Sequence, residues 1–325
     1  MKATAIAHPN VALIKYWGRK DEKLRLPTNG SISINLSEMT TTTTVEFSEN
    51  YKSDHIQIDK QNLFDEADRV IKHLDQIRTI VNSALKAKVV SENNFPSSTG
   101  LSSSSSGFAA LTVAATTALG LKLSEKQLSV LARLGSGSAC RSIPDGWVEW
   151  NDADTSEGSY AHSIFPKDHW DIADVVAVVS SEKKDISTSK GQKLAQTSPF
   201  FEARQASMNH KLNTLKIIIT NKNFQKFGEF VEAEALNMHA VMITSSPSLI
   251  YWSVGTIQLM KQIKKWRAEG MPAYFTINTG QDIHILIEQK NVKKLICKLQ
   301  ELMYVKKIIQ NTVSSGTFTS KSHLF

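Results

Sequence analysis

The stretch NFPSSTGLSSSSSG, residues 94–107, lies between a β-rich segment at 87–95 and an Ala- and Ser-rich segment at 103–119. The first segment predicts a strand and the second a helix of small residues. Gly100 allows a tight backbone turn, and the serines present hydroxyls and unhindered backbone N–H groups. Because the following helix would offer its positive dipole end and unpaired N–H donors, the stretch predicts an anion-binding loop.

A flexible serine-rich loop is the alternative interpretation of this stretch. Serine runs are common in such loops, but this one is bracketed by Pro96, Gly100 and an Ala-rich helical segment. It is not a Walker loop, because no Gly-Lys-Ser/Thr follows, and it lacks the GxGxxG spacing of dinucleotide-binding proteins. The stretch therefore favours a phosphate loop of another kind.

Around this loop, helical and strand-like segments mix without regular β-α-β alternation, which predicts an α+β fold. Residues 31–47 predict two strands joined by a short turn, and the five threonines at 40–44 an ordinary exposed strand. A change of pattern near residue 185 predicts a domain boundary there. The other expected elements are helices at 63–85, from Ser124 onward, at 199–220, 224–243, 248–268 and 291–303, and strands at 175–179, 273–277 and 283–287.

The composition is that of a globular protein with one large domain or two ordinary ones. The chain has 325 residues, of which 41% are hydrophobic and 21% are charged. No run of 18 apolar residues predicts a membrane span, and residues 1–10 lack the basic start and apolar core of an export signal. Cys140 and Cys297 form no CxxC pair and are expected as reduced thiols. We therefore expect a cytoplasmic protein.

The net charge of +7 comes from dispersed lysines and arginines. No basic block is interleaved with aromatic residues, so nucleic-acid binding is not predicted. A small polyanionic ligand fits this charge. No His, Cys or Asp set has metal-ligand spacing, so we expect no metal site of the protein's own and only Mg²⁺ carried by a nucleotide.

Two further segments place a cation beside small or aromatic residues. HPNVALIKYWGRK, residues 8–20, predicts a strand ending at Lys15, so that Lys15, Arg19 and Lys20 could clamp a phosphorylated ligand. LGSGSACRS, residues 134–142, predicts a second small-residue loop followed by Arg141, a side chain suited to bidentate binding of carboxylate or phosphate. The structural alternatives are a strand with a basic exit turn and a glycine turn that ends a helix.

Together these segments resemble the diphosphomevalonate decarboxylases of the GHMP kinase superfamily. The resemblance extends over residues 1 to about 290, and it rests on the order and spacing of several motifs together. The motifs are Asn10, KYWG at 15–18, LPTN at 26–29, the loop at 94–107, GSGSACRS at 135–142, GWVEW at 146–150, KKD at 183–185 with Gly191, Asn237 with His239 and Ala240, and YFTINTG at 274–280.

The resemblance implies a two-domain GHMP kinase fold with the active site in the interdomain cleft. The N-terminal domain, of the ribosomal protein S5 domain 2-like type, would span residues 1–185 and the C-terminal domain residues 186–325. Mg-ATP as phosphoryl donor and a homodimer are also implied. The implied reaction phosphorylates the tertiary 3-hydroxyl of 5-diphosphomevalonate, and loss of that phosphate drives decarboxylation to isopentenyl diphosphate in the mevalonate route of isoprenoid biosynthesis.

The resemblance also implies roles for individual residues. Lys15 would lie near the 3-hydroxyl and the transferred phosphoryl group, and Arg141 would hold the substrate carboxylate. Tyr16 and Arg19 would bind the 5-phosphate end. The remaining expected contacts are with the substrate through Ser136, Gly137 and Ser138, and with ATP through Pro96, Gly100, Leu101, Ser103, Ser104 and Ser189.

The late motif departs from the family pattern. These decarboxylases usually read Asp-Ala-Gly-Pro-Asn, with the aspartate assigned as base or orienter of the 3-hydroxyl, whereas this chain reads NTGQD at 278–282. Asn278, which takes the catalytic position, does not accept a proton in ordinary catalysis. Either Asn278 only orients the hydroxyl for a loose transition state, or Asp282 takes over, or the substrate is a monophosphate. We favour the first or the third hypothesis and expect Asp282 to be an ordinary turn carboxylate.

Other functions stay open at this point. They are a 5-phosphomevalonate decarboxylase giving isopentenyl phosphate, a mevalonate-type 3-kinase that does not decarboxylate, and a non-catalytic metabolite-binding protein. Lys15 and Arg141 favour the decarboxylase, and Asn278 favours the kinase. The order Arg19-Lys20, where the family has Lys-Arg, bears on which phosphate tail is preferred. His239 is expected to be a packed histidine and no base.

Overall fold

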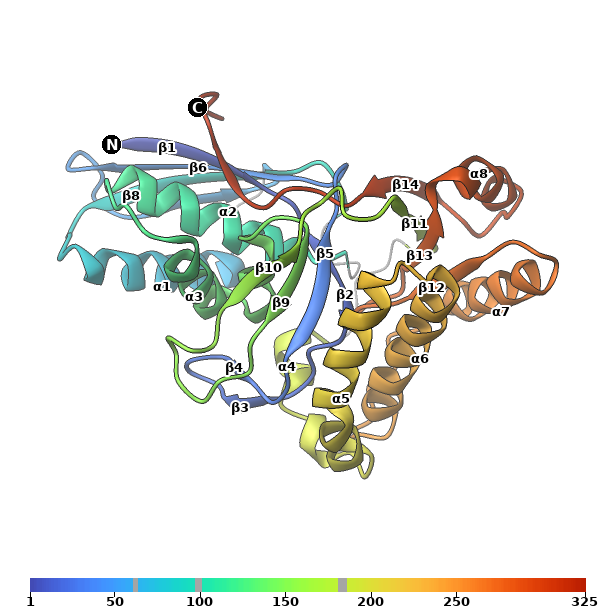
Figure 1. Cartoon of the computed structure of the whole chain (residues 1–325). Helices are drawn as coiled ribbons and strands as arrows, with labels where there is room; N and C mark the ends of the chain where they lie inside the picture. The colour runs from blue at the N-terminus through green and yellow to red at the C-terminus, as the bar shows by residue number, and fades with distance from the viewer. Residues whose placement is uncertain (61–63, 97–100, 181–185) are drawn as a thin grey trace.

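The structure is a computed structural model that describes residues 1–60, 64–96, 101–180 and 186–325. The helices pack against three sheets of four or five strands (Figure 1). Within the described residues, the paired strands are antiparallel except for β7 (His55–Ile58), which runs parallel to β8 (Lys86–Asn93). The predicted α+β class is therefore confirmed.

The first sheet holds both ends of the chain. Its strand order is β15–β1–β6–β8–β7, where β1 is Lys2–Ala7, β6 is Thr41–Ser48 and β15 is Phe318–Ser320. Because β15 pairs with β1, the two termini lie near each other in Figure 1. The last strand of the chain is thus an edge strand of this sheet and lies next to the first strand.

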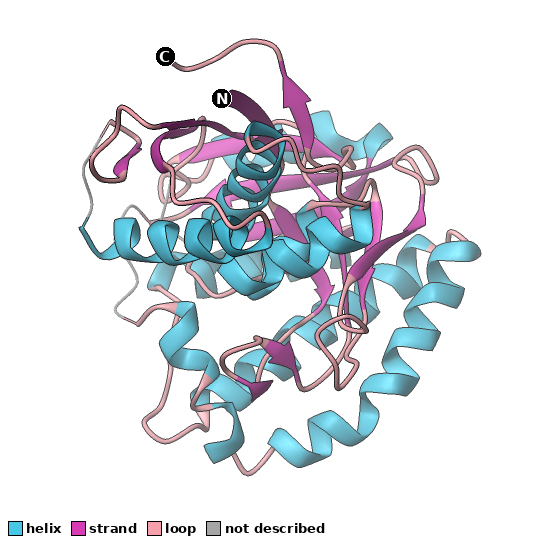
Figure 2. Cartoon of the chain, turned by 90° about the vertical axis from the view of Figure 1, so that its left-hand side faces the viewer, coloured by secondary structure: helices cyan, strands magenta, loops and turns pink. Residues whose placement is uncertain are grey.

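Three helices cover one face of this sheet (Figures 1 and 2): α1 (Phe64–Ile80), α2 (Ser103–Ala118) and α3 (Glu125–Gly135). The central one, α2, packs on β1 and β6, and its many alanines allow the backbone to approach the strands closely. Ser124 and Gln127 form a capping box at the start of α3, where the sequence predicted a helix start. The sheet therefore holds the N-terminus of α2 in a fixed position.

The threonine run was expected to be an exposed strand, and this is wrong. It forms β6, which lies in the interior of the first sheet between β1 and β8. Thr41, Thr43 and Thr44 are each at most 1% exposed. Thr43 shares a hydrogen bond with Ser91, and Thr41 donates one to Asn93, so the hydroxyls are satisfied inside the protein.

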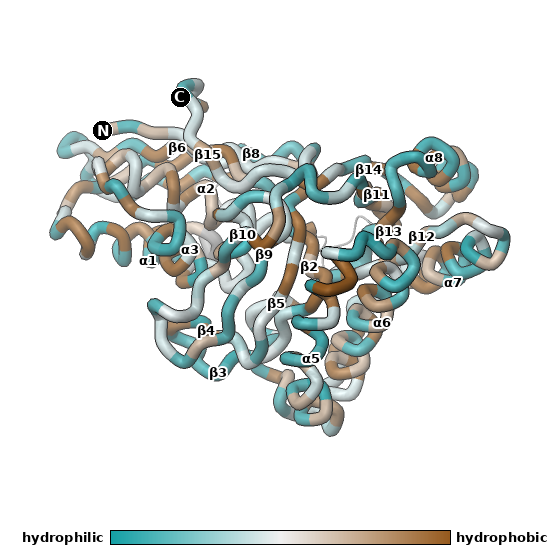
Figure 3. Tube along the Cα trace, viewed as in Figure 1, coloured by the Kyte–Doolittle hydropathy of each residue, from teal (hydrophilic) through white to brown (hydrophobic). Residues whose placement is uncertain are grey.

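The second sheet crosses the middle of the molecule. Its order is β10–β9–β5–β2, where β2 is Asn10–Ile14, β5 is Ser31–Asn35, β9 is Trp147–Trp150 and β10 is Ala161–Phe165. Figure 3 shows β9 and β2 as hydrophobic segments in the interior. The two strands expected at 31–47 are β5 and β6, but they belong to different sheets. The connection between them therefore passes from the second sheet to the first and does not form a hairpin.

The third sheet consists of three strands from the C-terminal half and one strand, β11 (Ile172–Val178), that precedes residue 185. Its order is β12–β13–β11–β14, where β12 is Ala273–Thr276, β13 is Ile283–Glu288 and β14 is Lys307–Thr312. Two helices, α7 (Val254–Ala268) and α8 (Val292–Gln300), pack on one face. Two longer ones, α5 (Phe201–Thr220) and α6 (Phe224–Ile243), pack on the other. The four expected C-terminal helices are thus confirmed, although α7 begins six residues later than expected.

The remaining described elements are short. They are β3 (Arg19–Asp21), β4 (Leu26–Pro27), η1 (Gly137–Ser142), α4 (Thr188–Gln192), η2 (Ala195–Thr197) and η3 (Gln289–Asn291).

One cluster of buried apolar side chains joins the second and third sheets. It includes Leu13 and Ile34 from the second sheet, Leu215 from α5, Phe227 from α6 and Val176 from β11. Interiors of this kind are close-packed and resist relative movement of the elements that share them. Residues at the end of β2 and residues on α6 are therefore held on one scaffold.

The division into domains 1–185 and 186–325 stays a prediction. Two strands bear on where its boundary would fall. The strand β11 lies before residue 185 but pairs with β13 and β14, and β15 lies at the far end of the chain but pairs with β1. Each half thus contributes one strand to the sheet of the other.

We expect Gly228→Ala to destabilise the protein, because a Cβ at this position of α6 would overlap the buried ring of Tyr274. Overpacking of this kind costs about 1–3 kcal/mol. The matched control is Gly107→Ala on α2, where a Cβ meets no atom within 4 Å. That control should gain about 0.5–1 kcal/mol from helix propensity. Urea unfolding of both variants measures the difference, and equal stability of the two would contradict the packing argument.

Candidate active site

A cavity of about 530 Å³ is lined by segments from both halves of the chain. They are the end of β2, the start of β3, the start of α2, the loop and η1 between α3 and β9, the segment around α4, the turn after β12, and one side chain each of α1 and α6. The predicted site residues that line it are Lys15, Tyr16, Arg19, Ser103, Ser104, Ser136, Gly137, Ser138, Arg141, Ser189 and Asn278. Segments that are distant in sequence thus meet in one pocket, which we call the main pocket.

The backbone of Lys15 is fixed on both sides at the end of β2. Its N–H donates to Glu234 Oε1 at 3.2 Å. Its carbonyl oxygen accepts hydrogen bonds from Arg204 Nη2 and from Asn29 Nδ2, each at 3.0 Å. The Cα of Lys15 therefore has little freedom to move relative to α5 and α6.

A buried charge cluster behind Lys15 makes these contacts possible. Glu234 on α6 pairs with Arg204 on α5 at 2.5 Å and with Lys211 at 2.8 Å. Burial alone would raise the pKa of Glu234, but the two cations outweigh burial and hold the pKa below its usual range. Arg204 also donates to Asn237 Oδ1. The carboxylate is thus ionised and fully engaged.

The side chain of Lys15 points into the main pocket and is 1% exposed. Its Nζ donates to Asn278 Oδ1 at 3.0 Å, and no carboxylate of the described residues lies within ion-pair distance of it. Burial, with a smaller contribution from Arg141, lowers the pKa of Lys15 to about 7. A substantial part of this amine is therefore neutral at neutral pH.

Asn278 is held by three neighbours. Its Nδ2 donates to Ser102 Oγ at 3.2 Å, and its Oδ1 accepts from Lys15. Its backbone oxygen lies 3.0 Å from Nε2 of His239. Burial lowers the pKa of His239 to about 3, so the ring is neutral and its Nε2–H can donate to the carbonyl. The expectation of a packed, structural His239 is therefore confirmed.

Arg141 is a buried cation without a carboxylate partner among the described residues. Its Nη1 donates to Ser31 Oγ at 2.7 Å and its Nη2 to Asn10 Oδ1 at 3.2 Å. Its guanidinium lies over the ring of Trp150 at 5.7 Å, and its Nε has no partner within the part of the chain that the structure describes. A buried guanidinium in this state is prepared to accept an anionic ligand.

The two small-residue loops of the sequence meet beside the pocket. The hydroxyls of Ser105 and Ser138 lie 2.6 Å apart, and Ser136 Oγ lies 3.4 Å from Ser104 Oγ. Gly137 is required there, because a Cβ would come within 2.9 Å of the Tyr16 ring. The phosphate loop and the second loop thus form one wall.

The KYWG turn brings a third basic side chain, Arg19, to the pocket. Arg19 Nε donates to Tyr16 Oη at 2.7 Å, and Arg19 also pairs with Glu22. Gly18 has φ +105°, and a Cβ would lie 2.7 Å from Thr28 Oγ1, so only glycine fits this turn. Gln192 on α4 accepts from Gly18 N and donates to the carbonyl of Tyr16, which ties α4 to the turn.

The N-terminus of α2 faces the same pocket. Ser102 precedes the helix with φ +62°, and its side chain does not cap the first turn. Ser103 and Ser104 line the pocket at this helix end. The N-terminus of a 16-residue helix is suited to bind phosphate oxygens.

Some predicted ATP contacts are not in this pocket. Leu101 is buried in the apolar core, and Pro96 lines neither of the two pockets described. Gly100 and the KKD motif at 183–185 lie outside the described residues. Asp282 lies outside the pocket lining, is 3% exposed and accepts a hydrogen bond from the Val179 N–H, in line with a structural role.

Sequence reasoning missed several residues of the lining and its support. Arg69 on α1 lines the pocket, and Gln192 joins α4 to the KYWG turn. Glu234 and Arg204 lie behind it. Charged residues spaced along a helix usually predict a solvated face, so no local signal distinguishes these residues.

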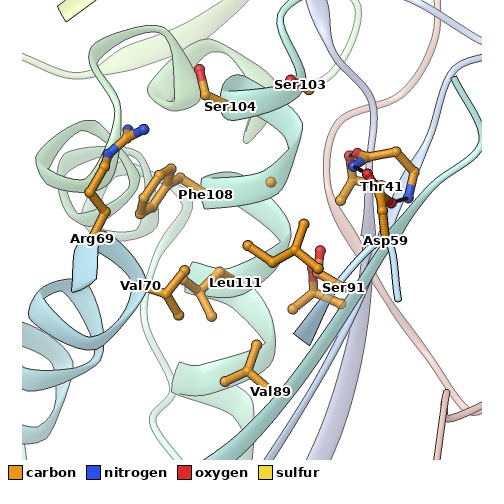
Figure 4. Close-up of a pocket in the computed structure, with 14 residues that line it drawn as sticks. Thr41, Asp59, Arg69, Val70, Val89, Ser91, Ser103, Ser104, Phe108 and Leu111 are labelled. Carbon is orange, nitrogen blue, oxygen red and sulfur yellow. Dashed lines mark hydrogen bonds between the residues drawn. The ribbon is translucent and has the colours of Figure 1, made fainter. Parts of the chain in front are cut away.

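A smaller cavity of about 150 Å³ adjoins the main pocket (Figure 4) and shares Ser103, Ser104 and Arg69 with it. Val70, Phe108 and Leu111 lie on one side in Figure 4, and Thr41 and Asp59 on the other. Asp59 accepts hydrogen bonds from the backbone and side-chain nitrogens of Asn93 at 2.8 and 2.9 Å. We call this smaller cavity the base pocket. Sequence reasoning did not predict it, because β6 was expected to be exposed.

Comparison with known proteins identifies the family. Residues 7–161 match the model of the diphosphomevalonate decarboxylase-like N-terminal domain, and residues 174–323 match that of the mevalonate 5-diphosphate decarboxylase C-terminal domain. The diphosphomevalonate decarboxylase of Candida albicans is 34% identical over 315 residues, which cover 91% of this chain and 87% of that protein. This chain belongs to the diphosphomevalonate decarboxylase family. The resemblance drawn from the motifs is confirmed.

Solved structures of diphosphomevalonate decarboxylases match the whole chain. One, in complex with MVAPP, AMPPCP and magnesium, has a TM-score of 0.93 at 36% identity and covers 99% of both chains. The mevalonate diphosphate decarboxylase from Enterococcus faecalis has a TM-score of 0.92 at 35% identity, again with 99% of both chains covered. The predicted two-domain fold is confirmed by these matches.

The described residues offer neither a metal site of their own nor a membrane-spanning helix. They contain no cluster of three or more His, Cys, Asp or Glu side chains able to hold a metal ion. None of their helices is both long and apolar enough to cross a membrane. The donor set of the main pocket, which is serines and cations, suits the phosphates of a nucleotide and not a bare metal ion.

We expect Glu234→Gln to cost about 3–5 kcal/mol of stability, because it leaves Arg204 buried without its counter-charge. Urea unfolding, with the midpoint compared at constant m value, measures the loss. The matched control is Glu229→Gln, an exposed position on the same helix, which should change stability little. A Glu234→Gln protein as stable as this control would show that the cluster does not hold the end of β2.

Proposed function

We propose that this chain catalyses the ATP-dependent decarboxylation of 5-diphosphomevalonate to isopentenyl diphosphate, ADP, phosphate and carbon dioxide. The observation that carries the proposal is that the buried amine of Lys15 and the buried guanidinium of Arg141, neither with a carboxylate partner among the described residues, line one pocket together with the N-terminus of α2. Buried charges need compensation. A substrate with a carboxylate at one end and phosphates at the other supplies it.

The substrate would lie between Arg141 at one end and Arg19 at the other. Arg141 binds the carboxylate with its guanidinium, whose Nε has no partner among the described residues. Tyr16 and Arg19 bind the 5-diphosphate, and Gly137 leaves room for the carbon chain beside the Tyr16 ring. Lys15 then reaches the 3-hydroxyl.

ATP would bind across the shared wall of the two cavities. The base pocket takes the adenine, with apolar contacts from Val70, Phe108 and Leu111. Ser103 and Ser104, with the first turn of α2, bind the phosphates, since these serines line both cavities. Ser189 faces the phosphates from α4. Mg²⁺ would arrive on the phosphate oxygens of the nucleotide and neutralise part of their charge.

The catalysis consists mostly of positioning and electrostatic stabilisation. A tertiary hydroxyl is a poor leaving group, and its phosphate ester is a good one. After phosphoryl transfer, the C3–O bond breaks toward phosphate, and the carboxylate held by Arg141 loses carbon dioxide as its bonding pair forms the new double bond. The cations of the pocket stabilise the departing phosphate. Asn278 holds the Lys15 amine at the reacting hydroxyl.

One observation favours a second candidate. Asn278 stands where the family usually has an aspartate, which is also a change expected of a 3-kinase that stops after phosphoryl transfer or of an enzyme for the 5-monophosphate. Arg141, aimed into the same pocket as Lys15, supports decarboxylation. Release of carbon dioxide separates the two functions.

A substrate panel tests the proposed function. Mevalonate and its 5-phosphate, 5-diphosphate and 3-phosphate forms are each assayed for ADP and carbon dioxide, and we expect both products in equal amounts from the 5-diphosphate. Arg141→Gln should lower kcat/KM about ten- to hundredfold, the loss of one charge-assisted contact. Lys293→Gln, an exposed change on α8, is the control. ADP without carbon dioxide from every substrate would identify a kinase instead.

The nucleotide position has its own test. Gly107 on α2 lines the base pocket with open space around it, so Gly107→Leu should fill that space and raise KM for ATP without a comparable change in KM for diphosphomevalonate. The control is Thr117→Leu, an exposed position on the same helix. Steady-state kinetics with each substrate varied would detect the difference. An unchanged KM for ATP would place the base elsewhere.

Three further points belong to this proposal. We place the protein in the cytoplasm, which its two free cysteines, Cys140 and Cys297, support. We keep the homodimer as a proposal based on the family resemblance. We also keep the division into N-terminal and C-terminal domains near residue 185, which the exchange of β11 and β15 between the two sheets qualifies.

A further inference from the structure

The main pocket contains no ordinary base among its described lining residues. No aspartate, glutamate or histidine of the described ranges lines it. The basic side chains among its described lining residues are Lys15, Arg19, Arg69, Arg141 and Lys190. Tyr16 is no substitute, because burial raises the pKa of its phenol. Of these lining groups, an amine that can lose its proton near neutral pH is the one candidate for accepting a proton.

The geometry at Lys15 fits a neutral amine as well as an ammonium. Its Nζ is held at 3.0 Å by the amide oxygen of Asn278, and a neutral amine still has a hydrogen to donate there. Asn278 is oriented by its own donation to Ser102, which turns its oxygen toward the lysine. The lone pair of the amine is then free to face the pocket. An aspartate at 278 would instead pair with the ammonium and keep it protonated.

The other charged and titratable groups around Lys15 are already engaged. Glu234 on α6 and Asp174 on β11 favour the ammonium, but Glu234 is bound to Arg204 and Lys211, and Asp174 to the imidazole of His284. Arg204 on α5 and Arg141 on η1 oppose the ammonium. His239 on α6 is neutral. Burial outweighs all of these and leaves the pKa of Lys15 at about 7.

We propose that Lys15 itself accepts the proton of the substrate's tertiary hydroxyl during phosphoryl transfer, and that Asn278 makes this possible by holding the amine without neutralising an ammonium. This inference rests on the proposed function. It replaces the carboxylate base of the usual family pattern with a lysine in this chain. The alternative of a base at Asp282 fails on geometry, because Asp282 binds the Val179 N–H and does not line the pocket.

Phosphoryl transfer moves the hydroxyl proton to Lys15 and the γ-phosphoryl group to the hydroxyl oxygen. The hydroxyl oxygen forms a bond to the γ-phosphorus, its O–H bond breaks, and the proton binds to the lone pair of Lys15 Nζ. The bond from the γ-phosphorus to the bridging oxygen breaks, and ADP leaves with that pair. The C3–O bond then breaks toward phosphate, with the new ammonium beside it, and the carboxylate leaves as carbon dioxide. The ammonium returns its proton to the released phosphate or to water.

The ionisation of Lys15 can be measured without turnover. In protein labelled with [ε-¹³C]lysine, the Lys15 resonance is assigned by its loss in Lys15→Arg. We expect it to titrate near pH 7 in the natural sequence and at clearly higher pH in Asn278→Asp. Asn221→Asp, the same charge change at the exposed end of α5, should leave the midpoint unchanged. A midpoint near the ordinary lysine value of about 10.4 would overturn the inference.

Single-turnover ADP formation between pH 5.5 and 9 tests the catalytic role. We expect the rate to fall to about a tenth of its plateau at pH 6 in the natural sequence, and the acid limb to move to lower pH in Asn278→Asp, which regains a carboxylate. Ionisation of the substrate phosphates is common to both proteins and does not produce this difference. A limb that is absent in the natural sequence, or that stays in place in Asn278→Asp, would overturn the inference.

Lys15→Arg separates charge from proton acceptance. Arginine keeps the positive charge but cannot be deprotonated, so phosphoryl transfer should fall about a hundredfold or more while KM for ATP changes little. Retention of the rate within about tenfold would mean that charge alone suffices. Absence of ADP formation with every phosphorylated mevalonate in the natural protein would overturn the proposed function, whereas the titration of Lys15 would still report on the amine.

Discussion

The carboxylate of Glu234 is the contact on which the position of the lysine depends. It accepts a hydrogen bond from the Lys15 N–H across 219 residues of sequence and pairs with two cations behind the pocket. One of them, Arg204, also binds the Lys15 carbonyl. Both backbone groups at the end of β2 are thereby tied to α5 and α6. The same helices share an apolar core with β2, so charge and packing fix one point together.

This cluster also explains how charge is distributed around the site. The carboxylates near Lys15 lie behind it, each bound to a cation or an imidazole, and none of them lines the described part of the pocket. The cavity, by contrast, is lined by basic side chains, among them Arg19, Arg69, Arg141 and Lys190. Basic side chains in a pocket attract anions, and an anionic ligand offsets the free energy that burying their charges costs. The arrangement suits a substrate and a nucleotide that together bring a carboxylate and several phosphates.

Sequence reasoning could find the residues whose role follows from a short segment of the sequence around them. Lys15 stands at the end of an apolar run before a glycine turn, and Arg141 follows a loop of small residues, so local conformation and chemistry coincide. Such reasoning could not find Glu234 or Arg204, because their partners lie on other elements and their helices look amphipathic. It also misjudged the threonine run, since whether a strand is central or at an edge depends on pairing with distant strands. The base pocket was not predicted for the same reason, because Thr41 and Thr43 of that strand line it.

Asn278 has an amide where the family usually has a carboxylate, and this difference changes which group in the site can accept the proton. An amide oxygen and a carboxylate oxygen can hold the same amine at the same distance, but only the carboxylate favours the ammonium by about the energy of an ion pair. With aspartate there, the lysine is a cation from the outset and another group must take the proton. With Asn278, the lysine can be neutral while the hydroxyl loses its proton and cationic when the phosphate departs. The two steps need opposite protonation states of one group, and the first step supplies the proton for the second. The departure from the family pattern therefore need not remove a function, because the proton acceptor lies within 3.0 Å of the substituted side chain.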